Sequence, residues 1–164
     1  MPFERAEGRM MRAFTLPGLD GTPVDTFRFR GRQPLIVLFH AGAACAPCAD
    51  LLQDLAANAA RIEAEGAQIV SVSVGNGVDD RALAEALAPH VLTLFDSEGK
   101  ASRLQGFNLP ALIITDRYGE IFAYWQADTD QALPDVDDVY GWLVWIEAQC
   151  ATCTTINWAK VGAS

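Results

Sequence analysis

Hydrophobic positions along the chain fall into two patterns, short continuous runs and longer segments in which apolar residues recur every three or four positions. The run at 35–39 is apolar throughout and contains β-branched side chains, which is typical of a strand covered on both faces. Apolar residues then recur at helical spacing as far as Gly66, a residue type that commonly ends helices. The expected elements are strands at 13–17, 24–29, 35–39, 69–74, 92–95, 111–115 and 121–125, helices that end at Gly66 and Pro89, a helical turn at 101–104 and a last helix at 136–149.

The order of these elements predicts the fold class. The first two strands are expected to pair as an N-terminal β-hairpin, and strands that alternate with helices after it indicate a parallel sheet. The last two strands, joined by a turn at 116–119, are expected to pair antiparallel, which makes the sheet mixed. We therefore expect an α/β fold with a central mixed sheet flanked by helices, in one domain over residues 1–149, followed by a tail at 150–164.

The composition is that of a folded globular domain. The chain has 164 residues, of which 51% are hydrophobic and 20% charged, enough apolar material for one core. Its net charge of −9, with no basic stripe, argues against a nucleic-acid binder and gives little attraction to anionic membranes. The apolar runs are strand-sized, far short of the roughly 20 residues that a membrane span needs. Residues 1–12 lack the apolar core of a secretory signal, so a cytoplasmic protein is expected.

The sequence Cys45-Ala46-Pro47-Cys48 carries the strongest chemical signal. It lies between the apolar strand at 35–39 and the helix behind it, and a helix N-terminus stabilises a thiolate through its N–H groups and dipole. Cys45 is expected to be the exposed, attacking thiol and Cys48, one turn into the helix, the resolving one. Two alternatives are buried cysteines that pack as small hydrophobic residues and cysteines that bind zinc.

A second pair, Cys150 and Cys153, follows the last predicted helix. It can act as a relay dithiol that reduces a Cys45–Cys48 disulfide by exchange. It can also complete a four-cysteine zinc site with the first pair, although about a hundred residues separate the two, or form a structural or intersubunit disulfide. We assign no metal to this chain.

Several segments resemble the thioredoxin-like superfamily, and within it the redoxins of the alkyl hydroperoxide reductase/thiol-specific antioxidant branch. The resemblance extends over residues 12–148. It implies a thioredoxin-like fold, no organic cofactor, and a cis-proline at Pro110 that faces the cysteine pair and, with Leu109, holds the substrate chain. The segments that carry it are 14–21, 35–39, Gly42, 45–48 and 108–113.

The chain departs from the peroxiredoxin pattern in that branch. Peroxiredoxins place a proline and a threonine before the catalytic cysteine, where this chain has Leu38 and Gly42. They also use an arginine near residues 109–111, and the nearest here is Arg103. Without the threonine hydroxyl and the arginine, little remains to orient a peroxide or stabilise its leaving oxygen, so peroxidase activity is disfavoured.

The chain also departs from ordinary thioredoxins. Ala44 stands where a tryptophan commonly precedes the first cysteine, and the strand at 35–39 lacks the buried carboxylate that moves a proton during exchange. His40, at the end of that strand, is a candidate proton acceptor or thiolate partner, with an ordinary turn histidine as the alternative.

These observations predict a thiol–disulfide oxidoreductase that acts on thiols or disulfides of proteins or small molecules. The alternatives are a peroxiredoxin-like thiol peroxidase and a non-catalytic module that senses oxidation or binds zinc. Trp142 and Trp145 lie off the apolar face of the last helix. They either rest on the tail or an adjoining loop, or form a partner surface such as that of a homodimer.

Overall fold

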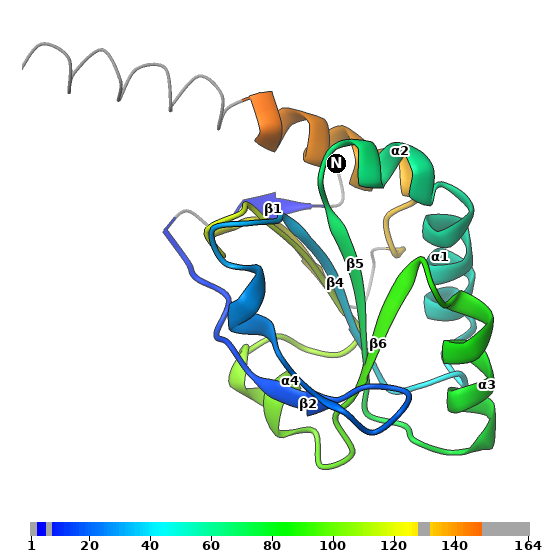
Figure 1. Cartoon of the computed structure of the whole chain (residues 1–164). Helices are drawn as coiled ribbons and strands as arrows, with labels where there is room; N and C mark the ends of the chain where they lie inside the picture. Colours follow the sequence, from blue (N-terminus) through cyan, green and yellow to red (C-terminus); the bar gives the residue numbers. More distant parts are fainter. Residues whose placement is uncertain (1–2, 6–7, 128–131, 149–164) are drawn as a thin grey trace, which may run out of the picture.

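The computed structural model describes residues 3–5, 8–127 and 132–148, and a six-stranded mixed sheet runs through its centre (Figure 1). The sheet order is β1-β8-β7-β4-β5-β6. β4, β5 and β6 run parallel, whereas β7 is antiparallel to both β4 and β8, and β1 is antiparallel to β8. The strands are β1 (Glu4–Arg5), β4 (Leu35–His40), β5 (Gln68–Ser73), β6 (Val91–Phe95), β7 (Ala111–Thr115) and β8 (Ile121–Gln126).

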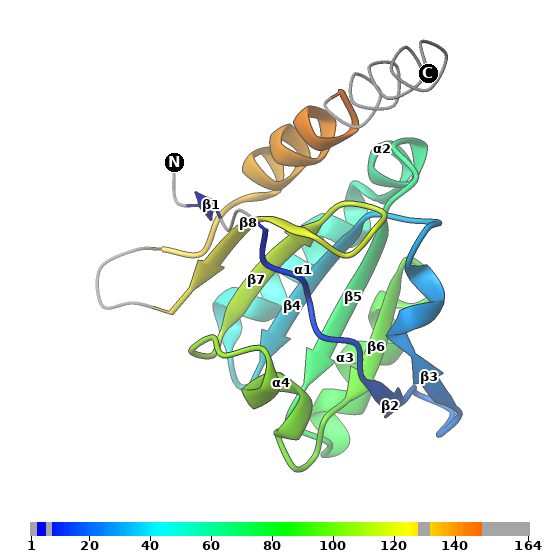
Figure 2. The ribbon, with the colours of Figure 1, turned by 90° about the vertical axis from the view of Figure 1, so that its left-hand side faces the viewer.

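Different segments cover the two faces of the sheet (Figure 2). Helices α1, α2 and α3 and the helix at 136–148 cover one face, and the β2–β3 hairpin, η1 and α4 cover the other. The predicted α/β class, mixed sheet and N-terminal hairpin are confirmed. These covering elements are β2 (Thr15–Pro17), β3 (Pro23–Asp25), the 3-10 helix η1 (Thr26–Phe29), α1 (Ala46–Ala57), α2 (Ala59–Ala64), α3 (Val78–Leu87) and α4 (Lys100–Leu104).

Strand β4 owes its continuous apolar sequence to burial on both faces. All six of its residues are buried. Ile36 and Leu38 pack in the core beneath α1, while Val37 and Phe39 pack in the core beneath the hairpin. Successive side chains of a strand point to opposite faces, so each face receives its own apolar set.

Three elements differ from the sequence-based expectation, and the first is the edge strand β1, which was not expected. Residues 26–29 form a 3-10 helix instead of extending the hairpin strand, because the side chain of Asp25 accepts a hydrogen bond from the Phe27 N–H and caps it. The long helix expected up to Gly66 is divided into α1 and α2 at Asn58. There the Asn58 side chain donates to the Asp54 carbonyl oxygen, a local bond that favours a helix end.

The C-terminal helix is described over residues 136–148, and Cys150 and Cys153 lie outside the described residues. Trp142 makes an edge contact with Phe3 at 6.1 Å between ring centroids, and Trp145 makes one with Phe122 of β8 at 5.8 Å. Within the described residues, Trp142 thus contacts the N-terminal segment and Trp145 contacts the sheet.

The core under α1 should make a large contribution to stability. Leu52 is fully buried there, so Leu52→Ala should lower the free energy of unfolding by about 2–5 kcal/mol through lost transfer energy and a residual cavity. Leu104→Ala is the control, since Leu104 is 48% exposed and its loss should cost about 0.5 kcal/mol or less. Urea denaturation measures both, and equal losses would contradict the described core.

Candidate active site

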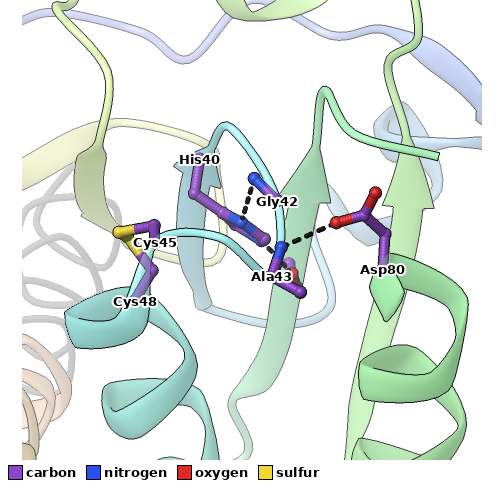
Figure 3. The surroundings of a disulfide bond; sticks show 7 residues. His40, Gly42, Ala43, Cys45, Cys48 and Asp80 are labelled. Atoms are coloured by element: carbon purple, nitrogen blue, oxygen red, sulfur yellow. Dashed lines mark hydrogen bonds between the residues drawn. A yellow bond between two sulfur atoms is a disulfide. The ribbon is translucent and has the colours of Figure 1, made fainter. Parts of the chain in front are cut away.

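The cysteine pair lies at the junction of β4 and α1 (Figure 3). Cys45 is the N-cap residue of α1 and Cys48 lies in its first turn, with Pro47 between them. A disulfide joins the two residues, whose Cα atoms are 5.2 Å apart. Cys48 is fully buried, whereas Cys45 is half-buried. A partner can therefore approach Cys45 but not Cys48.

The N-terminus of α1 offers a favourable environment for a thiolate. Cys45 begins the helix, and its carbonyl oxygen accepts the first backbone hydrogen bond, from Ala49, at 3.0 Å. The first turn of α1 contains no acidic residue, so no nearby carboxylate of that turn opposes the helix dipole. In the reduced protein, this end of the helix favours negative charge on the Cys45 sulfur.

The turn that precedes Cys45 is held by hydrogen bonds from three directions (Figure 3). The Gly42 N–H donates to Nδ1 of His40 at 3.1 Å. The Ala43 N–H donates to Oδ1 of Asp80 at 2.6 Å, and the Cys45 N–H donates to the Gly42 carbonyl oxygen at 3.1 Å. The position of Cys45 is thus set by β4, by α3 and by the turn itself.

His40 is buried beneath this turn, with 2% of its surface exposed. Because Nδ1 accepts from Gly42, the ring proton lies on Nε2, which donates to Oγ of Ser71 at 2.7 Å. Burial lowers the pKa of His40, and the negative charge of Asp80 offsets only part of that effect. His40 is therefore neutral near pH 7, with both ring nitrogens engaged, and its role as a proton acceptor stays a prediction.

Pro110 lies at the same edge of the sheet as the cysteine pair. It directly precedes β7, whose Ala111 is paired with Phe39 of β4, and the Leu109–Pro110 peptide bond is cis. The carbonyl oxygen of Pro110 accepts from Ala127. Leu109 is 36% exposed, and within the described residues its N–H and carbonyl groups make no hydrogen bond.

Three residues stand where peroxiredoxins have their proline, their threonine and, as the nearest candidate, their arginine. None of them offers a polar group to the site. Leu38 is buried in the core under α1. Gly42 has a φ of +134°, and a Cβ atom there would overlap Oδ1 of Asp80. Arg103 is an exposed residue in the last turn of α4.

The sequence analysis did not identify Asp80, whose carboxylate bonds the turn before Cys45. Nothing in the local sequence signals a contact between residues 37 positions apart. Among residues 3–5, 8–127 and 132–148, no group of three or more His, Cys, Asp or Glu side chains is arranged to bind a metal ion. In the same part of the chain, no helix has the length and apolar character that crossing a bilayer requires.

The sheet order, with a CxxC pair at the start of α1 and a cis-proline before β7, defines a protein with a thioredoxin fold. The sequence model of the AhpC/TSA family matches residues 8–124. The chain therefore belongs to the AhpC/TSA family, as the resemblance in its sequence predicted. A comparison with curated protein sequences gave no match.

Solved structures with this fold include both peroxiredoxins and disulfide oxidoreductases. The peroxidoxin BcpB from Mycobacterium tuberculosis has a TM-score of 0.72 at 15% identity, covering 89% of this chain and 98% of that one. A putative thiol:disulfide interchange protein DsbE from Chlorobium tepidum has a TM-score of 0.63 at 24% identity, covering 77% and 89%. The thioredoxin domain of a thiol-disulfide oxidoreductase from Bacteroides vulgatus has a TM-score of 0.66 at 22% identity, covering 84% and 95%. At these identities the similarity establishes the fold alone.

The lowered pKa of His40 makes stability depend on pH. As the pH falls below about 6.5, the unfolded chain binds a proton on this imidazole that the buried folded imidazole resists. The free energy of unfolding should therefore fall with decreasing pH below that value, by at most about 1.4 kcal/mol per pH unit from this group. Chemical denaturation between pH 5 and 7.5 measures the slope.

The matched variant is His40→Asn, which removes the imidazole and should flatten this slope. A slope that persists unchanged in His40→Asn would contradict the assignment.

Proposed function

We propose that this protein is a thiol–disulfide oxidoreductase that works through Cys45 and Cys48. The observation that carries the proposal is the unequal burial of the two cysteines in one helical turn, with Cys45 half-buried and Cys48 fully buried. Exchange needs one thiol that a partner can reach and a second that only the first can reach. Its AhpC/TSA membership, and the redox proteins among its structural neighbours, support a redox role.

The reaction consists of two exchange steps that balance in atoms and electrons. The Cys45 thiolate attacks one sulfur of a partner disulfide, and the other partner sulfur leaves as a thiolate. The Cys48 thiolate then attacks the Cys45 sulfur and releases the first partner sulfur. The partner gains two electrons and the cysteine pair becomes the disulfide. A cellular dithiol, or two molecules of a monothiol, returns the pair to the dithiol by the same steps in reverse and becomes a disulfide.

Leu109 and Pro110 are proposed to hold the partner chain beside Cys45. The cis-proline lies at the C-terminal edge of β4, and the exposed Leu109 keeps its backbone N–H and carbonyl groups unpaired within the described residues. A peptide strand can pair with these two groups. This placement supports a disulfide in an extended polypeptide as the substrate.

Thiol peroxidase activity is a second candidate, favoured by the family and by the similarity to a peroxidoxin. It lacks support from the site, because Leu38 and Gly42 offer no hydroxyl or proline ring where peroxiredoxins use them. Loss of one oxyanion donor typically costs a hundredfold or more in rate. We therefore place disulfide exchange first.

The proposal predicts opposite behaviour for the two cysteine variants. Cys45→Ser should abolish reduction of a protein disulfide such as insulin, because the attacking thiol is lost. Cys48→Ser should accumulate a mixed disulfide at Cys45, because the resolving thiol is lost. Mass spectrometry of quenched reactions detects the adduct. Full turnover by Cys45→Ser would overturn the proposal.

Peroxide consumption separates the two candidate functions. With the same thiol reductant, the wild-type protein should reduce hydrogen peroxide at least about a hundredfold more slowly than it reduces a reactive disulfide. Stopped-flow measurement of both second-order rate constants makes the comparison. Faster reaction with peroxide would favour the peroxidase. Four thiols that stay unreactive until a chelator is added would favour the zinc-binding alternative.

A further inference from the structure

Asp80 joins helix α3 to the turn in front of Cys45 (Figure 3). Its Oδ1 accepts a hydrogen bond from the Ala43 N–H at 2.6 Å. Its Oδ2 accepts one from the Gly77 N–H, at the N-cap of α3, at 2.8 Å. A single half-buried carboxylate therefore connects the start of α3 with the turn of residues 42–45.

Two glycines provide the space for this carboxylate. A Cβ atom at Gly75 would lie 2.6 Å from Oδ2 of Asp80 and 2.8 Å from the Ala41 carbonyl oxygen. A Cβ atom at Gly42 would overlap Oδ1, and Gly42 also has a φ in the region that side chains rarely adopt. The same carboxylate thus bonds the turn and excludes a side chain at position 42.

The effect of this contact differs between the two redox states. In the oxidised protein the disulfide itself ties Cys45 to the first turn of α1. In the reduced protein that tie is absent, and the hydrogen bonds of the turn act together with the Ala49 N–H bond to the Cys45 carbonyl oxygen to keep Cys45 beside Cys48. A contact that preserves the oxidised geometry in the reduced state raises the effective concentration of one thiol at the other.

We propose that Asp80 is a positioning residue for Cys45, which holds the reduced cysteine pair in the geometry of its disulfide. This inference rests on the proposed disulfide exchange and adds a residue outside the CxxC sequence to it. Asp80 thereby favours closure of the disulfide and speeds the resolving attack by Cys48. Its bond to the turn also explains why position 42 carries no side chain.

The test is the equilibrium constant for forming the Cys45–Cys48 disulfide in glutathione buffers at 25 °C, measured by alkylation and mass spectrometry. Asp80→Ala frees the turn in the reduced state, so this constant should fall about 3- to 10-fold. A tenfold fall makes the reduction potential about 30 mV less negative. The resolving step, followed from the glutathione mixed disulfide, should slow by a similar factor.

Asp79→Ala is the matched control, because Asp79 is the exposed neighbour in the same first turn of α3 and carries the same charge. Asp79→Ala should leave the equilibrium constant for disulfide formation and the rate of the resolving step unchanged. Asp80→Asn removes the charge but keeps one oxygen acceptor for the Ala43 N–H, so its constants should lie between those of the wild type and Asp80→Ala. Wild-type values in Asp80→Ala, or equal effects of Asp80→Asn and Asp80→Ala, would overturn the positioning role.

Gly42→Ala tests the same contact from the opposite side. It should by itself lower the equilibrium constant for closing the disulfide, and this single-variant result stands if Asp80→Ala does not fold. Where both variants fold, the double variant should show less than the sum of the two single effects, because both disturb one contact. Additive effects would overturn the shared contact. A wild-type protein that forms no reversible Cys45–Cys48 disulfide with glutathione would instead refute the proposed function, a result independent of the Asp80 comparison.

Discussion

The pairing of β4 between β5 and β7 is the constraint on which the rest of the structure depends. β4 is hydrogen-bonded on both edges and buried on both faces, so its direction and register are fixed. Its C-terminal end delivers His40, the turn and Cys45 to one edge of the sheet. Its pairing with β7 brings Pro110 to that same edge. The site is therefore a consequence of the strand register.

Around the cysteines, the protein combines an unopposed helix dipole with a rigid uncharged turn. The chain carries a net charge of −9, yet the first turn of α1 has no acidic residue. The carboxylate of Asp80 is engaged by two backbone N–H groups, and the nearby histidine is held neutral by burial. Local arrangement, rather than overall charge, thus determines the environment of Cys45.

The sequence predicted the parts of this protein that depend on local pattern. The apolar run at 35–39, the position of the CxxC pair at a helix start and the cis-proline at Pro110 all agree with the structure. The 3-10 helix η1 was missed although Asp25 two residues before Phe27 is a local capping signal. The bond between Asp80 and Ala43 was out of reach, because it depends on how α3 packs beside the turn.

The family and fold of this chain give different information about its reaction from the residues of its site. The fold is shared with peroxiredoxins and with disulfide oxidoreductases, so it does not distinguish the two reactions. The residues around Cys45 are the basis on which we propose disulfide exchange rather than peroxide reduction. Peroxiredoxins have a threonine three residues before the cysteine, whereas here Gly42 stands at that position with the carboxylate of Asp80 against it. The proposed exchange needs only an accessible sulfur, a buried partner thiol and a backbone segment that can pair with a peptide, and these are the roles that we propose for Cys45, Cys48 and Leu109.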